Sequence, residues 1–195
     1  MSLYSSRYLK NLSSETLSSV KNRLIAESRT QHTAFDIFLS HSYLDKDEVE
    51  GIYIELRQKG YSVYVDWIID PHLSRDNVTK EAAETIRKRL KASKSLLLAV
   101  STNAGLSKWI PWELGFVDGL TGQCALFPVS RDINPPKTFE RSEYLKLYPY
   151  VKNAELTTYS PDLFITESAN SYVAIRDWVR SREKPSYKYK NIDLL

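Results

Sequence analysis

The sequence predicts a parallel β-sheet wrapped by helices, the α/β class. Short apolar stretches rich in β-formers alternate along the chain with longer amphipathic stretches, which is the order of repeated βαβ units. One apolar stretch, residues 95–101 (SLLLAVS), has no polar alternation between its ends, as is typical of a strand buried on both faces. We therefore expect right-handed crossovers between neighbouring parallel strands.

The elements of the first third follow from local patterns. Residues 12–28 space their apolar side chains as an amphipathic helix, and residues 35–40 (FDIFLS) alternate as a strand. Asp45, followed three residues later by Glu48, has the spacing of a capping box that opens a helix. Gly60 is then the C-terminal cap of that helix.

The middle of the chain repeats this alternation. Residues 61–67 are rich in β-formers and precede a loop, and residues 78–90 space a long helix. A second helix over 109–120 carries Pro111 in its first turn, where proline is favoured. Residues 124–129 form the next strand. Together these elements predict a flavodoxin-like three-layer α/β/α sandwich with about five parallel strands.

After Pro128 the alternation of strand and helix patterns becomes irregular. Residues 155–159 are compatible with an edge strand, and residues 172–179 space a last helix capped at Ser168. We expect three parts: a helical extension over 1–32, a core over 33–135, and a C-terminal extension over 136–195 that packs on the core and ends in a loose tail, 184–195.

Composition excludes several classes of protein. The content of 42% apolar and 26% charged residues is that of a globular domain, and no apolar run approaches the length of a membrane span. The net charge of +3 comes from the ends: residues 1–30 hold five bases and two acids, and residues 175–195 hold six and three. The middle is therefore net acidic, which argues against a nucleic-acid groove. The lone Cys124 fits a reducing compartment, and we expect the cytoplasm.

Common catalytic and cofactor motifs are also missing. The sequence has no G-x-G-x-x-G, no G-x-x-x-x-G-K-[ST] and no G-x-S-x-G. Three histidines and one cysteine do not make a metal cluster, so no metal site is expected. If the protein is an enzyme, a carboxylate carries the chemistry. Glu113, in the apolar stretch SKWIPWELGFVDG, is the candidate.

Polar and aromatic residues gather where the expected strands end. Ligands of open parallel sheets bind beyond the carboxyl ends of the strands. The residues that follow these ends, which we expect to contact a substrate, are Ser40, His41, Ser42, Asp66, Trp67 and Trp109. Glu113, in the first turn of a helix, should be held ionised by the helix dipole and could stabilise an oxocarbenium-like transition state at a glycosidic carbon.

Several of these residues could have a structural role instead of a functional one. A glutamate in a first helical turn is often a cap, and tryptophans are more often core or interface residues than ligand clamps. Asp45 is interpreted as a cap alone. Trp109 lies four residues before Glu113 and shares its face, whereas Trp112 is about 100° around the helix axis. We therefore expect Trp109 to meet substrate and Trp112 to meet the interior or a neighbouring molecule.

Four segments, in this order, resemble the prokaryotic TIR (Toll/interleukin-1 receptor) domains: FDIFLSHSYLDKDEV, GYSVYVDW, SKSLLLAVS and SKWIPWELGFVDG. The W-x-x-x-E spacing of Trp109 and Glu113 is similar to that of TIR domains that cleave NAD, where the glutamate is catalytic. Residues 67–73 match the BB loop that helps to assemble TIR oligomers. They lack the glycine that many TIR domains carry there, and IPW replaces the usual small residue or cysteine between tryptophan and glutamate.

The resemblance implies an NAD+ nucleosidase of the ADP-ribosyl cyclase or transferase type. NAD is then a consumed substrate and no cofactor is needed. With the YLKLYPYV extension the chain is most similar to stand-alone TIR proteins of Thoeris-type anti-phage defence, whose ADP-ribose-derived signal passes to a separate effector. The sequence leaves open whether the product is free ADP-ribose, a cyclic isomer or a conjugate. The alternatives are a non-enzymatic TIR scaffold that acts by self-association and a nucleoside deoxyribosyltransferase-like enzyme.

Overall fold

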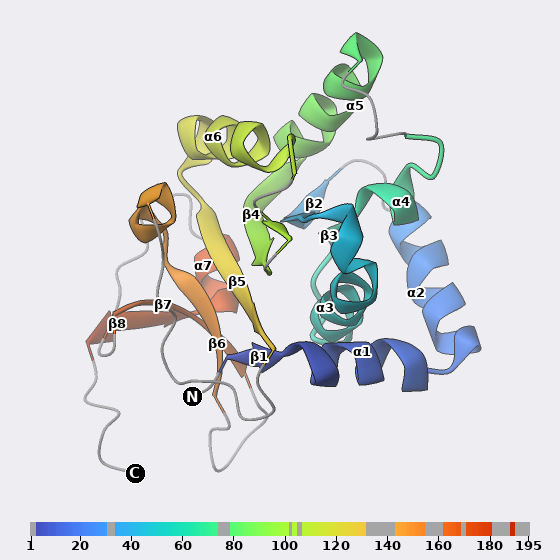
Figure 1. The fold of residues 1–195 in the computed structure, drawn as a ribbon, viewed down its shortest axis with the longest axis horizontal. Coiled ribbons are helices and arrows are strands. Elements are labelled where there is room, and N and C mark those ends of the chain that lie inside the picture. Colours follow the sequence, from blue (N-terminus) through green and yellow to red (C-terminus); the bar gives the residue numbers. More distant parts are fainter. Residues whose placement is uncertain are drawn as a thin grey trace.

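The computed structural model describes most of the chain (Figure 1). The described residues are 3–30, 34–73, 79–101, 103–104, 107–131, 143–154, 162–168, 171–180 and 188–189. Of the sequence-based expectations, the edge strand at 155–159 and all of the tail 184–195 apart from residues 188 and 189 lie outside them.

One mixed sheet runs through the described part of the chain. Its strand order is β3-β2-β4-β5-β6-β7-β8-β9, and β1 pairs with β5 off this path. The strands are β1 (Tyr4–Ser5), β2 (Phe35–Ser40), β3 (Val63–Tyr64), β4 (Ser93–Val100), β5 (Cys124–Ser130), β6 (Tyr150–Ala154), β7 (Asp162–Ser168), β8 (Ser171–Ala174) and β9 (Lys188–Tyr189). The run from β3 to β6 is parallel, and β7 to β9 add antiparallel strands.

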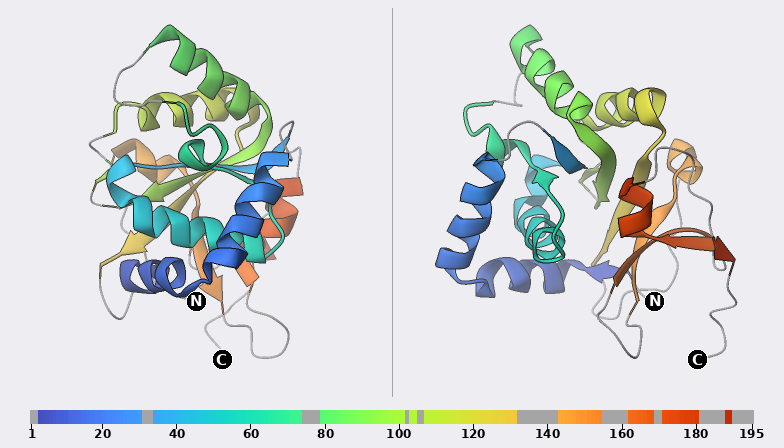
Figure 2. Two further views of the ribbon diagram at one scale, coloured as in Figure 1. Left: turned by 90° about the vertical axis from the view of Figure 1, so that its right-hand side faces the viewer. Right: turned by 180° about the vertical axis from the view of Figure 1, so that it is seen from behind.

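Helices cover both faces of the parallel strands. They are α1 (Ser6–Glu15), α2 (Ser18–Thr30), α3 (Lys46–Gln58), α4 (Asp66–Ile69), α5 (Lys80–Lys91), α6 (Ile110–Thr121) and α7 (Ile175–Arg180), with short 3-10 helices η1 (Tyr43–Asp45) and η3 (Glu143–Leu147). Figure 2 shows α5 and α6 on one side of the sheet and α3 and α1 on the other. The expected three-layer α/β/α sandwich with five parallel strands is confirmed.

The core lies between these layers, with β2, β4 and β5 at its centre. Strand β4 is buried at every position from Ser95 to Ala99, as its unbroken apolar pattern predicts. The expected cap at Gly60 is also present, because Gly60 has a φ of 89°, a left-handed conformation that suits glycine at the end of α3.

The N-terminal segment packs tightly on the α3 side. A Cβ added at Gly51 of α3 would lie 2.2 Å from the backbone oxygen of Leu9 in α1, so only glycine allows the two helices to approach this closely. Tyr4 and Tyr8 donate hydrogen bonds to the two carboxylate oxygens of Glu55, at 3.0 and 2.9 Å. Burial, followed by the charge of Glu55, raises the pKa of Tyr8 to about 12 and raises that of Tyr4 further.

Two expectations about the C-terminal part are wrong. The last helix begins at Ile175 rather than near Tyr172, because residues 171–174 pair with β7 as strand β8. Ser168 therefore ends a strand instead of capping a helix. The fifth parallel strand, β6, comes from within residues 136–195, which we expected to be an extension; the three-part division itself stays a prediction.

Candidate active site

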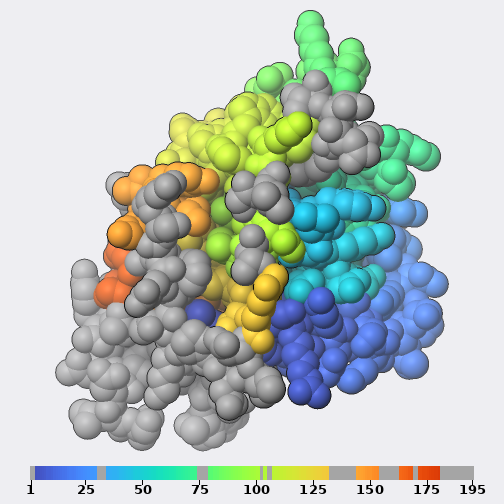
Figure 3. Space-filling model, in the orientation of Figure 1, coloured from blue at the N-terminus to red at the C-terminus, as the bar shows by residue number. Residues whose placement is uncertain are grey.

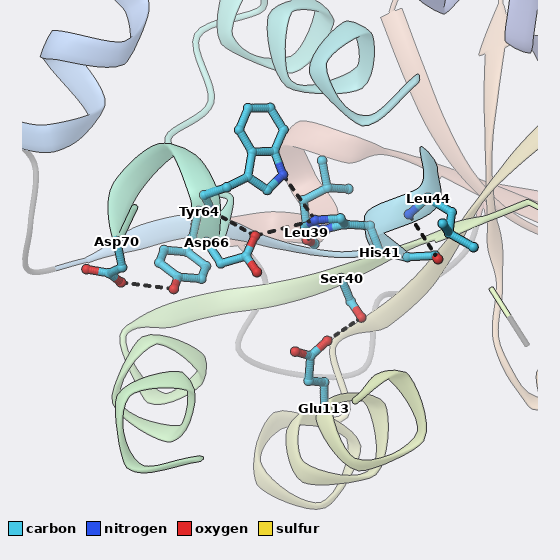
Figure 4. Close-up of polar contacts among 10 residues, drawn as sticks. Leu39, Ser40, His41, Leu44, Tyr64, Asp66, Asp70 and Glu113 are labelled. Carbon is cyan, nitrogen blue, oxygen red and sulfur yellow. Dashed lines mark hydrogen bonds and ion pairs between the residues drawn. The ribbon is translucent and has the colours of Figure 1, made fainter. Parts of the chain in front are cut away.

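The structure brings five of the expected site residues, Ser40, His41, Asp66, Trp67 and Glu113, into two clusters on opposite sides of β2. Ser40, the last residue of β2, and His41 are neighbours, and successive side chains of an extended chain point to opposite faces. Figure 4 shows Ser40 directed toward Glu113 of α6, and His41 directed toward Asp66 of α4. Trp67, the next residue of α4, also contacts His41. We call these the Glu113 cluster and the His41 cluster.

The Glu113 cluster joins the end of β2 to the first turn of α6. Pro111 occupies the start of this helix, as the sequence predicts, and places Glu113 in its first turn. The Ser40 hydroxyl donates a hydrogen bond of 2.6 Å to Oε2 of Glu113. Both residues are 0% exposed. A carboxylate at this depth needs hydrogen-bond donors and favourable dipoles, and the Ser40 hydroxyl and the helix N-terminus are two such groups.

In the His41 cluster, one imidazole contacts three groups. Nδ1 lies 2.8 Å from the Leu39 carbonyl oxygen, which can only accept, so Nδ1 carries the proton. Nε2 then accepts a hydrogen bond of 3.3 Å from the indole Nε1 of Trp67. Oδ1 of Asp66 lies 3.4 Å from the same Nε2 and accepts the Trp67 backbone N–H at 2.8 Å. The three expected residues His41, Asp66 and Trp67 therefore lie together.

Segment 67–73, which matches the BB loop, begins as helix and is fixed on three sides. Residues 66–69 form α4, where we expected strand end and loop. Arg89 of α5 binds Asp70 with two hydrogen bonds, 2.6 and 2.8 Å, and the Tyr64 hydroxyl donates to the same carboxylate at 2.9 Å. Arg29 of α2 donates from Nε to the Ile68 carbonyl at 2.9 Å. Helix α2 therefore helps to position this segment.

Asp45 has a role that the sequence reasoning missed. Asp45 stands at the N-cap position of α3, as predicted, but its side chain makes no capping bond, so the interpretation of Asp45 as a cap alone is wrong. Instead its carboxylate accepts hydrogen bonds from the Ser101 hydroxyl, 2.5 Å, and from Nδ2 of Asn103, 2.7 Å. Ser42 caps η1 through its hydroxyl, which accepts from the Leu44 N–H. Asp45 follows strand β2 and Ser101 follows strand β4, and these parallel strands are adjacent. Residues that follow the carboxyl ends of adjacent parallel strands lie at the same edge of the sheet, and this rule could have predicted the contact.

The two tryptophans differ from expectation in burial. Trp109 is 5% exposed and belongs to the core, whereas Trp112 is only half-buried. Their rings meet edge to face with centroids 5.7 Å apart. The guanidinium carbon of Arg87 in α5 lies 5.8 Å from the ring centre of Trp112, at cation–π distance. Trp109, which we expected to meet substrate, is therefore the more deeply buried of the two, and Trp112, which we expected to meet the interior or a neighbouring molecule, keeps part of its ring exposed.

Among the described residues, no group of three or more histidine, cysteine or carboxylate side chains could hold a metal ion. The described helices also include none that is long and apolar enough to cross a membrane. The Glu113 cluster contains a fully buried carboxylate beside a hydroxyl donor, at the sheet edge where open α/β folds bind ligands.

Comparison with known proteins agrees with this architecture. The TIR domain family model matches residues 37–158. A Bacillus cereus (strain MSX-D12) protein named "Probable 3' cyclic ADP-D-ribose synthase ThsB'" is 42% identical over 147 residues, 75% of this chain and 76% of that protein. A Cytobacillus dafuensis protein named "Putative cyclic ADP-D-ribose synthase TIR2" is 30% identical over 83 residues, 42% of this chain and 22% of that protein. The resemblance that the four sequence segments indicate is confirmed, and the chain belongs to the TIR domain family.

Proposed function

We propose that this chain is a TIR enzyme that cleaves the nicotinamide–ribose bond of NAD+ and closes the ADP-ribose moiety into a cyclic signal for anti-phage defence. One observation carries the proposal: Glu113 and Ser40 meet, buried, at the carboxyl edge of the sheet, in a chain 42% identical over most of its length to a protein named as a cyclic ADP-ribose synthase. NAD+ is the consumed substrate.

The chemistry assigned to Glu113 is electrostatic. When the bond between ribose C1 and the nicotinamide nitrogen breaks, its electron pair leaves with the nitrogen, and positive charge develops on the ribose. The carboxylate of Glu113 stabilises that charge, and Ser40 holds the carboxylate in one orientation. A hydroxyl of the same ADP-ribose moiety then attacks C1 and releases its proton to water, which gives a cyclic product.

The His41 cluster would bind the remainder of the substrate. The Trp67 indole offers an aromatic face, and His41 and Asp66 fix its orientation through contacts at 3.3 and 2.8 Å. Lys46 Nζ lies 5.2 Å from the Trp67 ring centre, so a positive charge is available near this face. Phosphate groups of NAD+ are anionic, and this charge complements them.

Complete burial of Glu113 implies that a single chain is closed to substrate. Self-association through residues 67–73, the segment similar to the BB loop, is the step that would open the Glu113 cluster. The product then acts on a separate effector protein. A cytoplasmic location is consistent with the single cysteine, Cys124, which is free and buried.

The test is incubation of the purified full chain with NAD+, with products resolved by mass spectrometry and Glu113→Gln as the matched control. The proposal requires nicotinamide release and an anhydro ADP-ribose mass with the self-associated wild-type chain, and neither with the variant. The buried Ser40–Glu113 bond also suits a scaffold that only self-associates, and in that case no nicotinamide appears even in assembled protein. A deoxyribosyltransferase would instead require a deoxynucleoside donor.

A further inference from the structure

Helix α2 packs against both α3 and α4, and it precedes residues 37–158, which the TIR domain family model matches. Figure 3 shows α2 (blue) against α3 (cyan), with residues 66–73 (blue-green) above them. A helix outside the matched region could serve only to bury apolar surface. The hydrogen bonds made by the last two turns of α2 indicate a more specific role.

The end of α2 is anchored on α3 by buried hydroxyl groups. Oγ of Ser28 lies 2.7 Å from the hydroxyl of Tyr53, which donates to the Leu24 carbonyl at 3.0 Å. A tyrosine hydroxyl has one proton, so Tyr53 accepts from Ser28 and donates to Leu24. Ser28 and Tyr53 are each 1% exposed, and breaking these bonds would leave polar groups buried without a partner. The end of α2 is therefore held in one position relative to α3.

The next residue, Arg29, connects this anchored end to α4. Its Nε donates a hydrogen bond of 2.9 Å to the carbonyl oxygen of Ile68. Helix α4 has only four residues, and the last carbonyl groups of a helix have no intrahelical donor. A basic side chain can supply that donor, and here it comes from 39 positions earlier in the chain. Arg29 therefore caps the C-terminal end of α4 from a different element.

Helix α4 also carries the aromatic face of the His41 cluster. Trp67 directly precedes Ile68, and its indole Nε1 donates to Nε2 of His41 at 3.3 Å. This distance is long for a hydrogen bond, so a small displacement of α4 would break it. Trp67 is half-buried, whereas Ile68 is 2% exposed. The indole therefore keeps an accessible surface, while the backbone that carries it is packed and capped.

We propose that Arg29 is a positioning residue for NAD+ binding. Through the Ile68 carbonyl it holds α4 where the Trp67 indole meets His41 and offers its face to a flat ring of the substrate. The proposal rests on the proposed function, because NAD+ supplies that ring. It gives α2 a part in substrate binding in addition to its packing on the core.

The experiment compares two substitutions of Arg29 in the full chain. Arg29→Gln keeps an N–H donor, since glutamine Nε2 is as many bonds from the backbone as arginine Nε. Arg29→Met has the same length and makes the same charge change, but its side chain has no donor. Arg29→Met should raise the KM for NAD+ about fivefold and leave kcat nearly unchanged, whereas Arg29→Gln should keep the wild-type KM. Light scattering checks that the proteins compared are self-associated to the same extent.

A second measurement does not depend on catalysis. The chain has four tryptophans, and the indole N–H signal of Trp67 in an NMR spectrum is identified by its loss in Trp67→Phe. An N–H proton that loses its hydrogen bond resonates at higher field. Arg29→Met should therefore move the Trp67 signal to higher field, and Arg29→Gln should leave it in place.

Lys21→Ala is the matched control. It removes a different contact of α2 with α3, the ion pair of Lys21 with Glu50 at 2.8 Å, and should change neither KM nor the Trp67 signal. Equal changes in Lys21→Ala and Arg29→Met would show a general loosening of α2 and overturn the proposal. An unchanged KM in Arg29→Met would overturn it too. If the self-associated wild-type chain releases no nicotinamide, the proposed function fails, whereas an unmoved Trp67 signal in Arg29→Met contradicts the positioning role alone.

Discussion

Ser40 and Glu113, separated by 73 positions in sequence, are joined by a hydrogen bond of 2.6 Å in which the serine hydroxyl donates to the carboxylate. The bond connects the end of the central strand β2 to the first turn of α6. Because both side chains are fully buried, the carboxylate orientation depends on this donor rather than on water. The geometry makes separate predictions for the two partners.

Glu113→Gln should remove the charge and keep the hydrogen bond, because the amide oxygen can still accept from Ser40. We expect nicotinamide release to fall by about 100-fold or more, with a melting temperature within a few degrees of wild type. Ser40→Ala instead leaves a buried carboxylate without this donor, which costs about 1.5–3 kcal/mol of unfolding free energy. A Gln variant with wild-type turnover would leave Glu113 with a structural role alone.

Sequence patterns predicted the parallel core because each local signal agreed with its tertiary environment. The apolar run in β4 is buried on both faces, and Pro111 starts α6 as its ring requires. Asp45 was misread because its spacing to Glu48 is that of a cap, while its actual partners, Ser101 and Asn103, are more than 50 residues away. Local spacing carries no signal for such a contact.

Two other differences have the same origin. Residues 171–174 have an apolar spacing that fits a helix and a strand equally well. They form a strand because they pair with β7. The Trp109 and Trp112 faces were assigned from helix geometry relative to Glu113, on the assumption that this face is open. The structure instead buries Glu113 and Trp109 together.

The two tryptophans should differ in their effect on stability. Trp109→Ala removes a core side chain and should cost about 3–5 kcal/mol of unfolding free energy. Trp112→Ala should cost less, because its ring is half-buried and its contact with Arg87 contributes about 0.5–1 kcal/mol. Urea unfolding of both variants measures the difference. Equal costs would contradict the burial order, and Trp109→Phe, which keeps a ring in the core, should recover part of the loss.

Asp45 should be energetically coupled to Ser101. A double-mutant cycle with Asp45→Ala and Ser101→Ala should give a coupling of about 1 kcal/mol or more in unfolding free energy, because each substitution removes the same hydrogen bond. A cap acts on the first turn of α3 and has no reason to sense Ser101. Zero coupling would therefore support the capping role. Asp45→Asn, which keeps one acceptor oxygen, should lie between wild type and Asp45→Ala.

Assembly through residues 67–73 should be tested at an exposed position. Ile69 is 5% exposed, so a charge there would disturb folding, whereas His72 lies on the surface. His72→Glu should leave the melting temperature nearly unchanged and should reduce both NAD+ cleavage and self-association measured by light scattering. Asn22→Glu, at an exposed neutral position of α2, makes the same charge change and is the matched control. Normal turnover by a monomeric His72→Glu protein would show that this segment does not assemble the site.

The contacts of Tyr4 and Tyr8 with Glu55 predict a loss of stability at alkaline pH. Burial and the Glu55 charge raise the pKa of Tyr8 to about 12 and that of Tyr4 further. A tyrosine in the unfolded chain has a pKa of about 10. Above that value the unfolded chain releases protons that the folded chain keeps. The stabilisation is therefore complete below about pH 10 and is lost as the pH rises toward 12.

The melting temperature should consequently fall steeply between about pH 10 and 12, and less steeply in Tyr4→Phe, which has no phenolic proton at that position. The comparison uses the slope against pH, because Tyr4→Phe also removes a donor to Glu55 and lowers stability at neutral pH. Some slope should remain, since burial raises the pKa of Tyr53 and Tyr148 as well. Tyr43→Phe, at an exposed tyrosine of η1, should keep the wild-type slope. Identical slopes in wild type and Tyr4→Phe would mean that the contact of Tyr4 in β1 with Glu55 in α3 does not hold the Tyr4 proton.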